Sequence, residues 1–403
     1  MTAQAMDAHS FDVVIAGGGM AGSTLALALH HLAPYLRVAL VEAQQAPVGL
    51  HPGFDGRSIA LAYGSVEIFQ QLNVWSQMQE HASAIKQIHV SDRGHSGIVN
   101  LSAKEQQLPA LGYVIELMHA GRVFEHALKQ TAVSLYCPAS VTDISQQEDV
   151  NLVTLSSGEI LRAKLLVGAD GGQSVCRKIL RMSQQQESYG TSAIIANVST
   201  SQPHLGRAFE RFTETGPCAL LPMQQGRSSL VWALHDEQAQ RLMHCSNETF
   251  LQQLQSTFGY RLGRFVKTGE RACYPLSLTK SDEPVAHRAV LVGNAAHTLH
   301  PVAGQGFNLG LRDVYVLASH LAQVGEDKDV GSFSCLANYW QQRQQDHQTT
   351  ITMTDTLARV FANQYFPLVA ARNGALHLMD SISLFKQPLA QQALGRFNLF
   401  SVN

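Results

Sequence analysis

Charged residues are scarce in this chain of 403 residues, and neither sign predominates. Asp, Glu, Lys and Arg make up 15% of the sequence, against about 25% in typical soluble proteins, and the formal net charge is −2. The chain lacks the basic excess that would predict a nucleic-acid-binding face or a polybasic attachment to anionic lipid. The apolar share of 45% instead predicts a large buried interior.

The six cysteines lack the spacing of a metal site or a disulfide framework. They are scattered without a Cys-x-x-Cys pair, and none of the 18 histidines forms a His-Glu-x-x-His motif. We therefore expect reduced thiols, a cytoplasmic location and no metal. The sequence also lacks a signal peptide and a run of about 20 apolar residues, which predicts no membrane span but leaves peripheral membrane contact open.

The first part of the chain has the pattern of a βαβ unit. Residues 11–16 form an apolar, β-branched run, as a buried parallel strand does. Residues 20–32 carry Ala and Leu at helical spacing, and residues 37–42 form a second apolar run that ends in an acid. A parallel strand pair with its crossover helix is the expected result.

Three glycines between the first strand and the helix match the pattern G-x-G-x-x-G at Gly17, Gly19 and Gly22. The first permits a tight turn, the second lets the backbone approach a pyrophosphate, and the third lets the helix pack close to the strand. The helix N-terminus favours phosphate, and Glu42 would accept hydrogen bonds from an adenosine ribose. In this context the motif predicts a dinucleotide site.

Two further motifs follow apolar runs later in the chain. Residues 168–177 (Gly-Ala-Asp-Gly-Gly-Gln-Ser-Val-Cys-Arg) contain an Asp-Gly pair that an ordinary turn explains, whereas Ser174 and Arg177 fit that explanation less well. Residues 291–310 lead through Gly293-Asn294 to a Gly-Gln-Gly loop that opens a helix. The N–H groups at such a helix start could face the electron-rich pyrimidine end of a flavin.

The three motifs in this order resemble those of the single-component flavin hydroxylases, the para-hydroxybenzoate hydroxylase-like family. Residues 51–61, 89–95, 206–213 and 298–310 resemble the ubiquinone-biosynthesis branch of that family. The resemblance implies an FAD-dependent monooxygenase that hydroxylates the ring of a prenylated methoxyphenol with O₂, through a flavin C4a-hydroperoxide. Only one dinucleotide fingerprint is present, which fits NAD(P)H as a reductant that docks transiently.

The resemblance also implies a fold and its divisions. The order α/β, then antiparallel β, then α/β again indicates an insertion into one nucleotide-binding domain. We predict a Rossmann-type, glutathione-reductase-like FAD-binding domain of residues 1–66, 104–182 and 272–345. A mainly antiparallel β substrate domain is expected from residues 67–103 and 183–271, followed by a helical C-terminal region of residues 346–403.

By resemblance, particular residues of this chain hold the cofactor. Gly17, Gly19, Gly22 and Glu42 would bind the ADP half, and Asp170 and Asn294 would flank the ribityl and pyrophosphate region. Arg57 and Arg122 are expected near the cofactor, although each could be an ordinary surface arginine. The flavin's pyrimidine side would be lined by Gly304, Gly306, Phe307 and Asn308. Asn294 replaces the family's Asp, which keeps an acceptor but removes a charge.

The sequence assigns no catalytic base. His297 and His300 lie close to the third motif, where packing against the helix start is the favoured interpretation. Six residues of the predicted sheet are pocket candidates, with ordinary sheet core as the alternative: Phe209, Phe212, Leu220, Leu221, Met223 and Trp232. Residues 360–379 are interpreted either as a helix packed on the FAD-binding domain or as an apolar surface for a membrane or other ubiquinone-biosynthesis proteins.

Other functions stay open at this point. The same family pattern fits hydroxylation of a different ring position or of a small soluble phenol, and it fits a catalytically silent FAD-fold subunit of a biosynthetic complex. A flavin-dependent halogenase would need a Trp-x-Trp-x-Ile-Pro type motif. The tryptophans Trp75, Trp232 and Trp340 lie far apart, which argues against that class.

Overall fold

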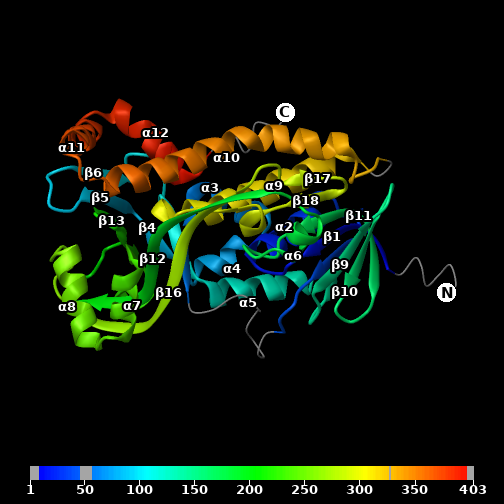
Figure 1. The fold of residues 1–403 in the computed structure, drawn as a ribbon, viewed down its shortest axis with the longest axis horizontal. Coiled ribbons are helices and arrows are strands. Elements are labelled where there is room, and N and C mark those ends of the chain that lie inside the picture. Colours follow the sequence, from blue (N-terminus) through cyan, green and yellow to red (C-terminus); the bar gives the residue numbers. More distant parts are fainter. Residues whose placement is uncertain (1–8, 46–56, 326–327, 397–403) are drawn as a thin grey trace.

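Three β-sheets organise the chain, which a computed structural model describes over residues 9–45, 57–325 and 328–396. Two sheets of eight strands lie toward opposite ends of the molecule (Figure 1). The third sheet has three strands. This mixed α/β architecture is the one that the sequence predicts.

The first sheet is built around the predicted βαβ unit. β1 (Ser10–Ala16) pairs in parallel with β2 (Val38–Val41) and with β11 (Ile160–Gly168). β8 (Ser134–Tyr136) and β18 (Ala289–Leu291) extend the parallel part on either side. Antiparallel pairs complete the sheet, formed by β9 (Val141–Gln146), β10 (Asn151–Leu155) and β17 (Val285–Ala286).

Alternate residues of β1 enter two separate apolar cores, because successive side chains of a strand point to opposite faces. Val13 and Ile15 pack in one core with α2 (Met20–Leu32), α5 (Leu117–Leu128) and α9 (Gln305–Val324). Val14 and Ala16 pack in the other core with residues of β9 and β10 and with Cys176 of α6 (Val175–Ile179). The carboxyl ends of β1, β2 and β11 therefore meet at one edge of a rigid scaffold.

The second sheet is antiparallel except for one pair. Its order is β19 (His297–Thr298), β16 (Phe265–Ser281), β12 (Gln184–Thr200), β15 (Arg227–His235), β14 (Gly216–Pro222), β13 (Arg207–Thr213), β5 (Gln87–Asp92) and β6 (Ile98–Ser102). β13 and β5 run parallel. One face is covered by α7 (Asp236–His244) and α8 (Asn247–Phe258), where Trp232 packs against Phe250. The other face is left to line a cavity.

β12 and β16 are much longer than the sequence indicates. Their pairing runs from Gln184↔Ser281 to Thr200↔Phe265, and these two long strands of the second sheet extend into the central region of the molecule (Figure 1). The apolar pattern predicts a strand only over residues 193–198 of β12 and none over β16. The extensions carry exposed polar side chains, so hydrogen bonding between distant segments forms them rather than a local pattern.

The third sheet has the order β3 (Ser58–Ala62), β7 (Gly112–Glu116) and β4 (Ser83–Ile85). Two helices follow β3, namely α3 (Tyr63–Gln71) and α4 (Trp75–Gln79). Trp75 and Met78 of α4 are buried in the core that also holds α2 and α9. β5 and β6, which come later in the same stretch of sequence, instead join the second sheet.

Three helices end the described chain: α10 (Phe333–Ala362), α11 (Phe366–Ser381) and α12 (Ser383–Leu394). α10 runs along α9 and reaches α11 beside β6 (Figure 1). The Arg372 guanidinium forms a buried ion pair with Asp92 of β5, 2.9 Å apart, and this fixes α11 to the second sheet. The interpretation of residues 360–379 as a helix packed on the FAD-binding domain is therefore wrong in its partner, because α11 packs on β5 and β6 of the second sheet. None of the helices in the described ranges is long and apolar enough to cross a bilayer.

Candidate active site

Two adjoining cavities open where the sheets meet. The first, of about 500 Å³, is lined by residues of all three predicted motifs, and we call it the glycine-rich cavity. The second, of about 970 Å³, lies beside the uncovered face of the second sheet, and we call it the apolar cavity. Met20, Asn294, Gly306 and Phe307 line both cavities, so a ligand can extend from one into the other.

The glycines of the first motif have distinct structural roles in the glycine-rich cavity. Gly17 has a φ of +103°, and a Cβ there would lie 2.5 Å from the carbonyl oxygen of Ala169. A Cβ at Gly22 would collide with the carbonyl oxygen of Gly17. A Cβ at Gly19 would meet no atom of the described residues within 4 Å, because it would project into open space. Gly17 and Gly22 are thus required by the backbone, whereas Gly19 keeps space in the cavity free.

Glu42 lies at the end of β2, beside the glycine loop. Its carboxylate accepts hydrogen bonds from the Gly18 N–H at 2.7 Å and from the Gln44 N–H at 2.8 Å. These two bonds hold the acid at the rim of the glycine-rich cavity. The predicted role on an adenosine ribose is compatible with this position.

Asp170 lies between β11 and α6 and also lines the glycine-rich cavity. Its Oδ2 accepts hydrogen bonds from the N–H groups of Val175 and Cys176, at 2.7 and 3.1 Å. Its Oδ1 is buried without a hydrogen-bond partner among the described residues. A buried oxygen without a partner costs stability unless a ligand uses it, so Asp170 is a strong candidate contact for a hydroxyl group of the cofactor, which can donate a hydrogen bond to the carboxylate.

Replacing Asp170 by alanine should weaken FAD binding. One charged hydrogen bond would be lost, which corresponds to roughly 1.5–3 kcal/mol of binding free energy. Titration of the apoprotein with FAD, followed by flavin fluorescence, measures the change. An unchanged dissociation constant would remove Asp170 from the cofactor site.

Ser174 and Arg177 of the second motif are explained by structure. The Ser174 hydroxyl caps α6 by accepting the N–H of Arg177 at 3.0 Å. The Arg177 guanidinium donates to the carbonyl oxygens of Ala295 and Gly172, both at 2.8 Å. Arg177 therefore joins the second motif to the loop of the third.

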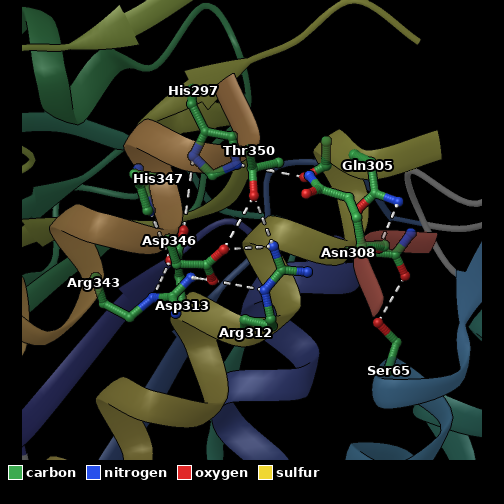
Figure 2. A network of polar contacts seen from close by, with 12 residues as sticks. Ser65, His297, Gln305, Asn308, Arg312, Asp313, Arg343, Asp346, His347 and Thr350 are labelled. Atoms are coloured by element: carbon green, nitrogen blue, oxygen red, sulfur yellow. Dashed lines mark hydrogen bonds and ion pairs between the residues drawn. The ribbon is translucent and has the colours of Figure 1, made fainter. Parts of the chain in front are cut away.

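The third motif forms the start of α9. Gly304 adopts a left-handed conformation with a φ of +63° and precedes the helix. The Asn308 side chain is fully engaged: it accepts from the Ala62 N–H and the Ser65 hydroxyl and donates to the carbonyl oxygens of Ala60 and Gly304 (Figure 2). Although Asn308 lines the apolar cavity, its side chain ties β3 and α3 to α9, and a flavin contact would fall to the backbone N–H groups of the first helical turn.

The two predicted arginines lie in different settings. Arg57 lines the apolar cavity, and its guanidinium lies 5.5 Å from the centre of the Tyr274 ring. Arg122 is exposed on α5 and is not among the described residues that line either cavity. Its role at the cofactor stays a prediction. Residues 51–56 of the segment that resembles the ubiquinone branch lie outside the described residues.

The pocket candidates of the second sheet divide into two groups. Phe209, Phe212 and Leu221 line the apolar cavity, although Phe209 and Phe212 also pack in the cores on opposite faces of the sheet. Leu220, Met223 and Trp232 are not among the described residues that line the cavity and belong to the packed cores, as the alternative of ordinary sheet core expects. Leu368, Leu376, Met379 and Leu389 close the apolar cavity from α11 and α12, a contribution that no local sequence pattern indicates.

A network of buried charges fixes α9 to α10 behind the third motif (Figure 2). Arg312 donates to Asp346 at 2.7 and 2.9 Å, and Arg343 donates to Asp313 at 2.8 Å. His297, Asp313 and His347 place one possible ligand atom each within 4.8 Å of one another. The guanidinium of Arg343 already neutralises Asp313 there, so this cluster is an ion-pair network rather than a cation site.

His297 and His300 lie behind the cavities rather than in them. His297 is 1% exposed, with Nε2 3.4 Å from the Gly306 carbonyl oxygen, as the packing interpretation expects. Burial and the nearby His347 lower the pKa of His297 to about 4, and Asp313 opposes this only in part. Burial lowers the pKa of His300 to about 4 as well, opposed by Asp355.

These two histidines should make the protein acid-sensitive. Between pH 6.5 and pH 4 the unfolded chain binds protons at these sites and the folded chain does not, so stability falls as the pH falls through this window. Each site contributes up to about 1.4 kcal/mol per pH unit. Urea unfolding at pH 7.5, 6 and 5 measures the slope, which His300→Gln should reduce. A slope that the substitution leaves unchanged would contradict the assignment.

Comparison with known proteins identifies the family. The model of the FAD binding domain family matches residues 10–354, which is most of the chain. The chain belongs to this FAD-binding family. The open space at Gly19 and the unpartnered Oδ1 of Asp170, both lining the glycine-rich cavity, fit a cofactor with a pyrophosphate and ribityl hydroxyls.

Two relatives align with nearly the whole of this chain. Ubiquinone hydroxylase UbiL of Rhodospirillum rubrum is 34% identical over 96% of this chain and 90% of its own length. The 3-demethoxyubiquinol 3-hydroxylase of Escherichia coli is 30% identical over 95% of this chain and 98% of its own length. The crystal structure of p-nitrophenol 4-monooxygenase PnpA from Pseudomonas putida has a TM-score of 0.78 at 16% identity and covers 96% of this chain and 100% of that one.

These comparisons confirm several predictions. The family, its ubiquinone-biosynthesis branch and the FAD cofactor are as the motifs predict. The protein is an FAD-dependent monooxygenase on the flavin-hydroxylase fold. The roles of the individual cofactor-binding residues, Arg122 above all, stay predictions.

Proposed function

We propose that this protein hydroxylates the aromatic ring of a prenylated methoxyphenol in ubiquinone biosynthesis, with NAD(P)H and O₂. By sequence it resembles 2-octaprenyl-6-methoxyphenol hydroxylase within the ubiquinone branch. The observation that carries the proposal is the apolar cavity, which adjoins the glycine-rich cavity through Asn294 and Phe307. A substrate ring at this junction would lie beside the flavin.

The size and lining of the apolar cavity favour a substrate with a long apolar chain. Ligand sites usually measure about 300–1,000 Å³, and this one, at about 970 Å³, is near the upper end. A phenol ring alone would fill a small part of it. Its lining is mostly aliphatic, with Ile88, Leu101, Leu221, Leu368 and Met379 among the side chains. Each buried CH₂ group of a prenyl chain adds about 0.8 kcal/mol to binding.

The chain's own residues would position the ring and keep water out. FAD, when bound, supplies the redox chemistry and the activated oxygen. The aliphatic walls from the second sheet and from α11 and α12 exclude water from the junction, which limits wasteful release of peroxide. Fixed orientation of the ring beside the flavin would select one ring position.

Substrates of increasing prenyl length test the proposal. Catalytic efficiency should rise with chain length in the wild type. Ala375→Phe fills part of the cavity wall on α11 and should raise KM for a long-chain substrate about tenfold, which equals about 1.4 kcal/mol or nearly two buried CH₂ groups. The KM for a substrate without the prenyl chain should stay unchanged.

Ala370→Phe is the matched control, because Ala370 is exposed on the same helix and is not among the described residues that line the cavity. It should leave both KM values unchanged. A wild type that prefers an unprenylated phenol would instead support a small soluble substrate. A protein that binds FAD but hydroxylates no phenol would support a silent subunit.

We further propose that the protein contacts the lipid phase in which such a substrate resides. Large apolar side chains are exposed on and beside α11 and α12, at Tyr365, Phe366, Leu378, Ile382 and Phe385. They lie on the helices that also close the apolar cavity. Several large apolar side chains exposed on neighbouring helices are typical of an interaction surface. Co-sedimentation with liposomes, compared between the wild type and Phe366→Ser, tests this contact.

A further inference from the structure

We propose that Glu210 is the catalytic base that accepts the phenolic proton of the substrate, an inference that rests on the proposed function. Glu210 lies in the middle of β13 and lines the apolar cavity. It is 9% exposed. Among the described residues that line this cavity, it is the one carboxylic acid.

Strand geometry directs Glu210 to the cavity side of the second sheet. Ala208 and Phe212, two positions away on either side, line the cavity and pack in its apolar core. Arg211 points to the other face, where its Nε donates to the Thr257 carbonyl oxygen of α8. Because side chains alternate along a strand, Glu210 shares the face of Ala208 and Phe212.

The strand neighbours of Glu210 on that face are apolar. Ala219 of β14 and Val90 of β5 lie opposite it, and both line the cavity. An acid that faces an apolar cleft is a common sign of a functional group.

The two arginines of the cavity and the cysteine beside it are poorly suited to take a proton from a phenol. Arg372 is ion-paired with Asp92, and Arg57 lies over the Tyr274 ring. Cys218 of β14 packs on the opposite face, and burial raises the pKa of its thiol, with Arg211 opposing and Glu210 adding to this rise. Glu210 is the one carboxylate acceptor among the described residues that line the cavity.

The proton transfer balances without a further reactant. The phenol O–H bond breaks, its electron pair stays on the phenol oxygen, and the proton moves to a carboxylate oxygen of Glu210. The negative oxygen makes the ring electron-rich, which favours attack on the activated oxygen that the FAD reaction supplies. As the new C–O bond forms, the O–O bond of the activated oxygen would break. The proton that the attacked carbon releases would neutralise the oxygen left on the cofactor side, and Glu210 would return the borrowed proton to the phenol oxygen. A carboxylate can use its second oxygen for a protein contact throughout.

Glu210→Gln in the FAD-loaded protein tests the proposal. The variant should lose about 10²-fold or more in the rate of ring hydroxylation at neutral pH, since general bases contribute about 10²–10⁴-fold. FAD content and NAD(P)H oxidation without phenol should match the wild type. The loss should shrink as the pH rises toward about 10, where a phenol ionises unaided. Glu210→Asp keeps the carboxylate and should retain part of the rate.

Two controls make the outcome decisive. Glu214→Gln changes an exposed acid just beyond the same strand, which pairs with Arg93 at 3.7 Å, and should leave the rate unchanged. Bound 4-nitrophenol reports phenolate by its visible absorption, and Glu210→Gln should reduce that signal at a given pH even without turnover. If the Glu210→Gln variant keeps the wild-type rate and pH profile, the assignment of Glu210 as the base is overturned, while the proposed function stands. A wild type without hydroxylase activity would overturn the proposed function instead.

Discussion

Replacing Gly19 by valine should give a folded protein that no longer retains FAD. The valine side chain would project into the glycine-rich cavity, where no protein atom of the described residues lies within 4 Å of the added Cβ. The φ of Gly19 is −64°, so the backbone accepts a side chain without strain. The purified variant should lack the visible flavin spectrum, while its thermal unfolding should match that of the wild-type apoprotein.

Gly22→Val is the contrasting variant. Its side chain would collide with the carbonyl oxygen of Gly17, so the loop and α2 would have to move apart. This variant should lose stability as well as FAD. A yellow, FAD-loaded Gly19→Val protein would contradict the placement of the cofactor in the glycine-rich cavity.

Replacing Asp346 by alanine should destabilise the protein by about 3–5 kcal/mol, because it removes a buried carboxylate that two buried arginines share. Arg312 and Arg343 both bond to this carboxylate, at 2.7 and 2.6 Å, and all three side chains are buried. The free energy of unfolding in urea measures the loss. Arg312 lies on α9 four residues after Asn308 of the third motif. Because the loss of Asp346 should disturb this part of α9, retention of FAD should also weaken.

Glu125→Ala serves as the control for Asp346→Ala. Glu125 pairs with Lys129 on the surface of α5, with the lysine side chain 69% exposed. Solvent-exposed pairs contribute between about 0 and 1 kcal/mol, so this variant should unfold almost as the wild type does. Equal losses in the two variants would contradict the difference between buried and exposed pairs on which the prediction depends.

The parts of the fold that the sequence predicts well are those with a local pattern. α2 begins and ends at Met20 and Leu32 as predicted, because Ala and Leu recur at helical spacing between a glycine loop and a proline. β13, β14 and β15 likewise coincide with short apolar runs of the sequence. The polar halves of β12 and β16 could not be predicted, since only pairing between distant segments makes them strands.

The site shows the same division. Gly17, Gly19, Glu42, Asp170 and Asn294 line one cavity because the carboxyl ends of parallel strands meet at one edge of the sheet. Asn308 is among the predicted cofactor-binding residues, and its role at the cofactor stays a prediction. Its side chain bonds to β3 and α3, which no sequence spacing reveals. No motif in the sequence indicates Glu210, the proposed base, although strand alternation places this acid on one face with Ala208 and Phe212.

The most direct test of the account is turnover under ¹⁸O₂ with NAD(P)H and a prenylated methoxyphenol, followed by mass spectrometry of the product. We expect FAD-dependent formation of a product that carries one ¹⁸O atom, and NAD(P)H oxidation that accelerates when the phenol is present. An FAD-loaded protein whose NAD(P)H oxidation ignores every prenylated phenol, and which incorporates no ¹⁸O into any of them, would contradict it.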